Sequence, residues 1–160
     1  MKIYIASDHA GYELKEKLKM YLSHMGRDVE DRGAYEYDPN DDYPDYVKQV
    51  AVAIAQDQTS RGIIIGGSGE GEAMCANRIA GVRAAVFYGT EFAKTAVDVS
   101  GRTSEDPFEI VRLTRLHNDA NVLSLSSRFL NTEEATEAVK IFLETKFSGE
   151  AHHTRRLSKF

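Results

Sequence analysis

The sequence of 160 residues contains one cysteine, Cys75, and no tryptophan. A lone cysteine cannot form an intrachain disulfide, which favours a reducing compartment. No run of 18 apolar residues occurs, so we expect no helix that crosses a bilayer. The first residues, MKIYIASDHAG, turn polar too soon for a secretory signal peptide. Together these absences predict a cytoplasmic protein that does not use a membrane as a partner.

An excess of positive charge is also missing. The chain carries 20 lysines and arginines against 25 aspartates and glutamates, which gives a net charge of −5. Broad binding to nucleic acid or to anionic membranes needs a basic surface, so we expect neither partner, although one small basic pocket fits this balance. Hydrophobic residues make up 42% and charged residues 28%, as in a globular chain. The length suits one domain that needs neither a disulfide nor a structural metal.

Short apolar segments alternate with stretches of helical periodicity along the chain. Residues 62–65 are apolar without a break, the pattern of a strand covered on both faces in a parallel sheet. This alternation predicts an α/β fold, a single doubly wound (Rossmann-like) domain over residues 1–147 with about five parallel strands and helices on both faces. A polar and basic tail follows over residues 148–160. We predict strands over residues 3–6, 27–31, 62–65, 82–88 and 121–125, and helices over 12–25, 46–55, 73–79, 92–97, 108–116 and 133–147.

A glycine-rich loop, residues 66–72, is the strongest local signal. It reads GGSGEGE and joins a predicted strand to a predicted helix, at the sheet edge where doubly wound folds bind ligands. Its glycines free several backbone N–H groups to face a phosphate or a developing oxyanion, although a tight turn alone would also need glycine. The loop matches neither the dinucleotide fingerprint nor the P-loop, which argues against a nicotinamide cofactor and a nucleoside triphosphate.

Two pairs of titratable residues lie at this predicted edge. Glu72 and Glu70 compete for the role of a general base, and either also fits a surface charge in the first turn of a helix. Asp8 and His9 follow the first strand, where they suit ligand contacts, or an N-cap aspartate beside an incidental histidine. The residue types alone leave both choices open.

A further polar pair, His117 and Asn118, precedes the last predicted strand. Histidine suits proton transfer near neutral pH and Asn118 suits a hydrogen bond to a substrate oxygen, but a solvated loop would have the same composition. The tail carries HHTRR over residues 152–156, which would grip a phosphate or form a frayed basic terminus. Adjacent histidines without a spaced acidic or thiolate partner argue against a metal site. Cys75 lies among small and apolar residues, so we expect it to pack rather than react.

Taken together, several segments resemble the ribose-5-phosphate isomerase B family, which includes galactose-6-phosphate isomerase subunits. They occur in the family's order over nearly the whole chain, and the combination is specific although no single segment is. The matching segments are DHAG (8–11), DYP (42–44), GGSGEGE (66–72), ANR (76–78), HNDANV (117–122), SR (127–128), and His153 with Arg156.

The resemblance implies a cofactor-free aldose–ketose isomerase that acts on a phosphorylated sugar through an enediolate. One branch of the family uses a cysteine at the end of the third strand as its base, and Gly66 holds that place here. The other branch uses a glutamate at the end of the glycine loop, which Glu72 matches. The resemblance therefore points to the glutamate-base branch, and Cys75 is not the family's cysteine.

The same resemblance implies a role for each site residue. His117 would protonate the ring oxygen, and Asn118 would steady the enediolate. Asp8 and His9 would bind the sugar, the glycine loop would form an anion hole, and Arg128 with Arg156 would hold the phosphate. Members of the family are at least dimers with a crevice shared between subunits, so we also expect a second copy as a partner. The full set implied for the substrate is Asp8, His9, Tyr43, Gly67, Ser68, Gly69, Glu70, Gly71, Asn118, Arg128, His152 and Arg156.

Two departures from the family's pattern bear on the substrate. His152 stands where the family usually has arginine, so we expect it to act with Arg156 on the phosphate and to make that contact pH dependent. An insertion around residues 98–115 is expected to lengthen the helix before His117. Its position beside the presumed acid leaves the size of the sugar open.

The sequence is therefore compatible with three functions. The first is a ribose 5-phosphate isomerase. The second is an isomerase for another phosphorylated aldose, either a six-carbon one such as allose or galactose 6-phosphate, or a four-carbon one. The third is a subunit that binds sugar phosphates without catalysis, and the presence of Glu72, His117 and Asn118 argues against it.

Overall fold

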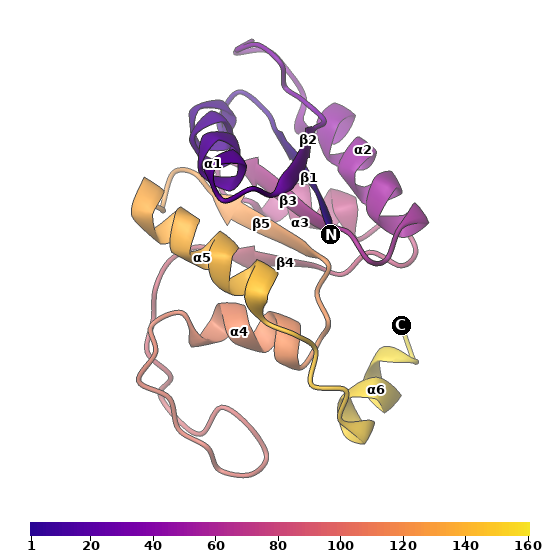
Figure 1. Ribbon diagram of the computed structural model, residues 1–160, viewed down its shortest axis with the longest axis vertical. Helices are drawn as coiled ribbons and strands as arrows, with labels where there is room; N and C mark the ends of the chain where they lie inside the picture. Colours follow the sequence, from indigo (N-terminus) through magenta and orange to yellow (C-terminus); the bar gives the residue numbers. More distant parts are fainter.

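The computed structural model describes residues 1–160 and contains one sheet of five parallel strands (Figure 1). The strands lie in the order β2-β1-β3-β5-β4, so the fourth strand forms one edge beside the fifth and does not pair with the third. Their bounds are β1 (Lys2–Ser7), β2 (Asp28–Asp31), β3 (Arg61–Gly66), β4 (Ala84–Phe87) and β5 (Val122–Ser126).

Helices cover both faces of the sheet, which confirms the predicted doubly wound fold. Their bounds are α1 (Tyr12–His24), α2 (Tyr43–Gln56), α3 (Glu70–Ala76), α4 (Glu109–Leu116), α5 (Thr132–Glu144) and α6 (Ala151–Leu157). The first, fourth and fifth helices contribute to the hydrophobic core on one face, and α2 and α3 to the core on the other. None of the helices combines the length and the apolar character that a membrane span requires.

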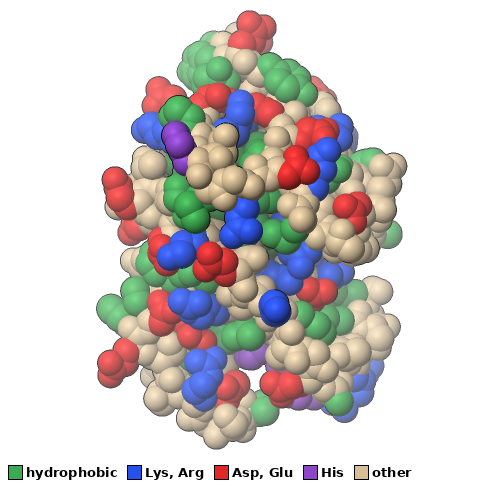
Figure 2. Space-filling model, in the orientation of Figure 1, with side chains coloured by type: hydrophobic (Ala, Val, Ile, Leu, Met, Phe, Trp, Pro, Cys, Tyr) green, Lys and Arg blue, Asp and Glu red, His purple; other side chains and the backbone are tan.

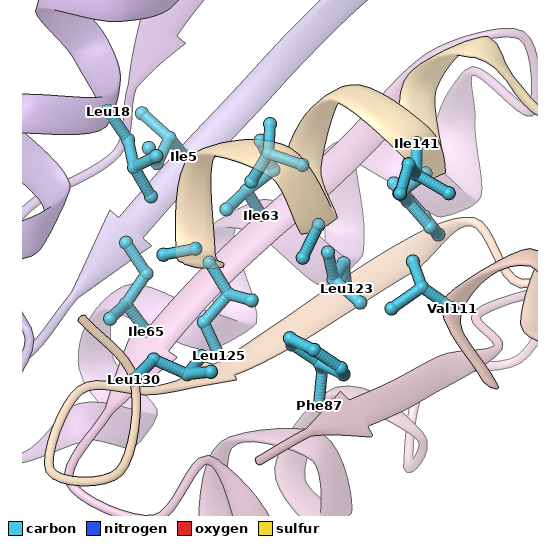
Figure 3. Close-up of a cluster of buried hydrophobic side chains, with 14 of the residues drawn as sticks. Ile5, Leu18, Ile63, Ile65, Phe87, Val111, Leu123, Leu125, Leu130 and Ile141 are labelled. Atoms are coloured by element: carbon cyan, nitrogen blue, oxygen red, sulfur yellow. The ribbon is translucent and has the colours of Figure 1, made fainter. Parts of the chain in front are cut away.

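The isoleucines of β3 explain its unbroken apolar sequence. Ile63 and Ile65 belong to the core under α1 and α5, whereas Ile64 belongs to the core under α2. Because successive side chains of a strand point to opposite faces, a strand buried on both sides must be apolar at every position. Figure 3 shows the first of these cores, which also contains Ile5, Leu18, Phe87, Val111, Leu123, Leu125, Leu130 and Ile141.

The segment between β4 and α4 differs from the prediction. The helix expected over residues 92–97 is wrong, because residues 88–108 form an irregular loop that extends away from the body (Figure 1). The side chains of residues 91–96 are exposed, so no packing stabilises a helix of that length. The expectation that the insertion lengthens the helix before His117 is wrong as well, since α4 spans only Glu109–Leu116. The additional residues make a surface loop instead.

Candidate active site

The glycine loop crosses the carboxyl edge of the sheet between β3 and α3. Gly69 has φ of +79°, a left-handed conformation that favours glycine, and α3 begins directly after it at Glu70. The helix therefore starts three residues earlier than predicted and takes in both glutamates of the loop. Glycine at position 69 permits the abrupt change from strand to helix.

Serines of the neighbouring strand β5 hold the loop in place. Ser124 Oγ donates to the carbonyl of Gly69 at 2.6 Å, and Ser126 Oγ donates to the carbonyl of Gly67 at 3.1 Å. These two bonds hold the loop against β5 through its carbonyls and leave its amides available as donors, as an anion hole requires. Four backbone N–H groups of the loop form no hydrogen bond within the chain, those of Gly67, Ser68, Gly69 and Gly71.

The carboxylate of Glu72 lies directly over Gly66. A Cβ atom added at Gly66 would overlap the Glu72 carboxyl group, so any side chain at position 66 would displace it. Glu72 is only 4% exposed, and burial raises its pKa, with a further contribution from the charge of Asp8. Glu70, the competing candidate, is only partly buried. The geometry therefore favours Glu72 as the base.

The segment that follows β1 lies beside the glycine loop. Ser127 Oγ is 2.7 Å from the carbonyl oxygen of Ala10 and 2.9 Å from that of Gly66, so it bridges the two segments. Asp8 is buried and its Oδ1 accepts hydrogen bonds from the backbone N–H groups of Ala10 and Gly11. The bridge places the Asp8 segment at the same edge as the glycine loop.

Two larger side chains lie close to the glycine loop at Gly67 and Gly71, which have no side chains of their own. The hydroxyl end of Tyr43 lies 2.9 Å from where a Cβ atom of Gly71 would stand. The guanidinium of Arg128 lies 3.1 Å from the corresponding point at Gly67, and this arginine is exposed. The structure thus brings the predicted residues of β1, α2, β3 and β5 together at one edge.

His117 and Asn118 lie at the opposite, amino edge of the sheet. They follow α4 and precede β5, where the carbonyl of Asn121 accepts a hydrogen bond from the N–H of Gly62 at the start of β3. Gly66, by contrast, pairs with Ser126 at the far end of β5. Four steps along a strand span about 13 Å. Within one chain, the presumed acid and the presumed base are therefore not brought together.

The tail shares this amino edge and forms a helix rather than a frayed end. Figure 1 shows α6 standing apart from the sheet, joined to α5 by a linker. The N–H of Ser148 in that linker donates to the carbonyl of Leu116 at 3.1 Å. The His153 ring stacks on the His117 ring with centroids 4.2 Å apart, and His152 packs against His153 at 3.9 Å. The tail and the presumed acid thus form one unit.

The charged groups of the tail differ in their surroundings. Arg156 is exposed and forms no ion pair within the chain. His152 is partly buried, with Nδ1 at 3.5 Å from the Glu150 carboxylate. Burial, followed by the neighbouring His117 and His152, lowers the pKa of His153. Histidine side chains gather near the lower end of the face in Figure 2, separate from one higher up.

Two clusters bring possible metal ligands within 4.8 Å of one another, Asp8 with His9 and Asp41, and Glu150 with His152 and His153. In the first, His9 Nδ1 is already paired with Asp41 at 2.6 Å. An imidazole that donates Nδ1–H to a carboxylate at this distance does not offer that nitrogen to a metal. In the second, the rings of His152 and His153 pack against each other with centroids 3.9 Å apart and planes inclined at 44°.

Reasoning from the sequence missed some residues that shape this site. Asp41 binds His9 through both its backbone and its ring, and the serines of β5 anchor the glycine loop. The serines did leave a signal, since Ser124 and Ser126 interrupt an otherwise apolar buried strand. Asp41 left none, because it lies in a turn where aspartate is common.

Comparisons with known proteins agree on one family. The family model described as Ribose/Galactose Isomerase matches residues 3–101 and 105–160. The chain is 41% identical over 157 residues to a probable ribose-5-phosphate isomerase B of Mycoplasma pneumoniae, with 98% of this chain and 91% of that protein covered. It is 34% identical over 157 residues to the ribose-5-phosphate isomerase B of Mycolicibacterium paratuberculosis, with 98% and 87% covered.

Solved structures show the same relationship. The crystal structure of ribose-5-phosphate isomerase B from Mycoplasma genitalium with bound ribulose 5-phosphate aligns with a TM-score of 0.84 at 36% identity, covering 99% of this chain and 92% of the other. The enzyme from Thermotoga maritima aligns with a TM-score of 0.82 at 41% identity, covering 99% and 95%. Fold and sequence therefore point to the same relatives.

Proposed function

Since this chain belongs to the ribose/galactose isomerase family, we propose that it is an aldose–ketose isomerase that interconverts ribose 5-phosphate and ribulose 5-phosphate through an enediolate. The relative from Mycoplasma genitalium, solved with ribulose 5-phosphate, supports this substrate. The observation in this chain that carries the proposal is the buried carboxylate of Glu72 beside the open amides of the glycine loop. We place the reaction in the cytoplasm, in keeping with a single free cysteine and no membrane-spanning helix.

Glu72 is the base that moves the proton between C1 and C2 of the sugar. Its burial raises the pKa of the carboxyl group, which makes the carboxylate a stronger base than an exposed one. A carboxyl group shielded from water also retains the proton until it is returned to the neighbouring carbon. The amides of Gly67, Ser68, Gly69 and Gly71 face the oxyanion that develops in between.

A complete site requires two copies of the chain. One copy supplies Glu72, the glycine loop and Arg128 from its carboxyl edge. Because His117 lies at the other edge, the acid that opens the sugar ring must come from a partner. We therefore propose a homodimer, or a dimer of such dimers, in which the amino edge of one copy meets the carboxyl edge of the next.

The C-terminal helix α6 reaches the site of the partner copy together with His117. The stacking of His153 on His117 and the bond between Ser148 and Leu116 hold α6 against the end of α4. Arg156 has no ion-pair partner within its own chain. It can therefore bind the substrate phosphate in the neighbouring copy, together with the partner's Arg128. We expect His152 to act on the same phosphate, in a contact that depends on pH because the neutral imidazole carries no charge and donates only one hydrogen bond.

A ketose-formation assay on ribose 5-phosphate tests this proposal, with allose 6-phosphate, galactose 6-phosphate and a four-carbon aldose phosphate in parallel. Glu72→Gln should lower kcat by about 10²–10⁴-fold while KM changes little, because the amide keeps the shape but cannot accept the proton. For the native chain, activity should fall as the pH is lowered through the raised pKa of Glu72. Glu70→Gln is the matched control and should retain most of kcat. A loss of activity in Glu70→Gln but not in Glu72→Gln would reverse the assignment.

A further inference from the structure

Asp41 lies behind His9 and touches it twice. Asp41 Oδ1 accepts a hydrogen bond from the backbone N–H of His9 at 3.0 Å and lies 2.6 Å from the ring nitrogen Nδ1. The Asp41 side chain is 4% exposed and that of His9 is 30% exposed. One carboxylate oxygen, held inside the protein, therefore fixes both the main chain and the ring of a residue that reaches the surface.

This contact decides which ring nitrogen His9 presents. A carboxylate can only accept, so Nδ1 carries the proton and donates it to Asp41. The nitrogen left for other contacts is Nε2. His9 lines a hollow of about 540 Å³ at the carboxyl edge, together with Ser127 and Arg128. An anion in that hollow meets Nε2 beside a guanidinium.

The Asp41 carboxylate has few other polar partners. Its second oxygen, Oδ2, is buried and forms no hydrogen bond. A buried carboxylate that is not neutralised elsewhere favours a cationic partner, and His9 is the group in contact with it. The hydrogen bond from His9 to Asp41 raises the pKa of the His9 imidazole, with a further contribution from Asp8.

Other charged groups lie around the His9–Asp41 pair and also affect the protonation of His9. Arg128 opposes protonation of His9, although its effect is smaller than that of the two aspartates. The ring of Tyr37 meets the His9 ring edge to face at 6.5 Å. The titratable or charged groups around the His9–Asp41 pair are Asp8, Glu13, Lys17, Tyr37, Tyr46, Arg128 and Glu133.

We propose that Asp41 is a positioning residue that holds His9 as a cationic N–H donor aimed at the anionic substrate. The inference rests on the proposed function for the identity of that anion, a sugar phosphate. We assign Asp41 no contact with the substrate, since its carboxylate hydrogen-bonds His9 and lies against the hydroxyl of Tyr46. A neutral imidazole in the same place would lack the charge that attracts a phosphate dianion.

The first test needs no substrate. NMR titration of the five histidine rings, with His9→Gln to assign the signal of His9, gives its pKa in the native protein. We expect a pKa above the ordinary one, and a lower pKa in Asp41→Asn, which loses the carboxylate that raises it. Asp38→Asn, which changes an exposed carboxylate of the same turn, should leave it unchanged. A native His9 that titrates at or below the ordinary value overturns the proposal even if Asp41→Asn fails to fold.

The second test uses ribose 5-phosphate at two pH values. At a pH between the His9 pKa values that the titration gives for the native chain and for Asp41→Asn, the variant should raise KM by about tenfold with a much smaller change in kcat, because only its imidazole is then neutral. At pH 6 the imidazole is protonated without help, so the difference in KM from the native chain should shrink. A merely structural role predicts the same ratio of KM at both pH values, and that result would overturn the proposal. If the protein does not isomerise ribose 5-phosphate at all, the NMR titration still decides the role of Asp41.

Discussion

Gly66 and Glu72 show how one residue determines which base a site can use. The Glu72 carboxylate occupies the space that a side chain at position 66 would need. A thiol at the end of β3 and a carboxylate from α3 therefore exclude each other sterically. In this chain, the glycine at the end of β3 leaves the room that the Glu72 carboxylate occupies.

Gly66→Ala tests this exclusion with a single methyl group. The added Cβ should push the Glu72 carboxylate out of position and lower kcat by about tenfold or more, since catalysis is sensitive to small displacements of a reacting group. Gly89→Ala is the control, because a Cβ atom there meets nothing within 4 Å. Steady-state kinetics on ribose 5-phosphate gives the comparison. Equal kcat for Gly66→Ala and the native chain would show that the carboxylate need not lie over Gly66.

At the scale of elements, Arg115 and Asp119 join α4, β5 and the tail. Arg115 is 2% exposed, and it binds the Asp119 carboxylate at 2.8 Å and the carbonyl of Thr145, where the linker to α6 begins. Arg83 holds the other Asp119 oxygen at 2.9 Å. Asp119 has φ of +44°, unusual for a residue with a side chain. These bonds fix the turn that carries His117.

Asp119→Asn tests this clamp, because asparagine tolerates the same backbone conformation. Removing the carboxylate should cost about 1–3 kcal/mol of stability, the range for a lost hydrogen bond to a charged group, and should lower kcat through a looser His117 turn. Thermal unfolding at fixed protein concentration measures the loss of stability, and steady-state kinetics measures the change in kcat. Glu91→Gln removes an exposed pair with Lys94 and should change stability by less than about 0.5 kcal/mol. Similar losses in the two variants would contradict the clamp.

The docking of α6 should depend on pH. His153 is buried against His117 and His152, and burial lowers its pKa below the ordinary value of about 6.5. A base with a depressed pKa in the folded state contributes stability above the ordinary pKa and loses it as the pH falls. Amide hydrogen exchange over residues 145–160 should therefore show less protection, after correction for intrinsic rates, at pH 5.5 than at pH 8. His153→Phe should weaken this dependence, and the exposed control His24→Gln should leave it intact.

The sequence predicted well what depends on local pattern. Apolar runs located four of the five strands, because buried parallel strands need apolar residues, whereas the edge strand β2, with the sequence DVED, gave a weaker pattern. The helix expected over residues 92–97 failed because periodicity does not reveal whether a face will be covered, and this segment has nothing to pack against. Composition alone pointed to the glycine loop, whereas the choice of Glu72 over Glu70 came from the family resemblance. The bond between Asp41 and His9 was not, since it joins segments 32 residues apart.

At the scale of the whole molecule, the separation of the two edges decides how the site is assembled. The carboxyl edge carries Glu72 and Arg128, and the amino edge carries His117 and Arg156. The length of β5 lies between them, so no movement of side chains brings the two groups together. The sequence alone could not reveal this separation, because it does not show that the two groups lie at opposite ends of the strands. An isolated chain is expected to bind substrate weakly and not to turn it over.

Mixing two inactive variants tests this assembly directly. Glu72→Gln lacks the base but keeps the acid, and His117→Ala lacks the acid but keeps the base. If each site combines Glu72 of one copy with the acid of the other, a mixed dimer contains one site with both defects and one intact site. After unfolding and joint refolding at equal amounts, half of the dimers are mixed, so activity should recover to about a quarter of the native value. Each variant refolded alone is the control. Recovery that fails although mass spectrometry detects mixed dimers would place base and acid in the same chain.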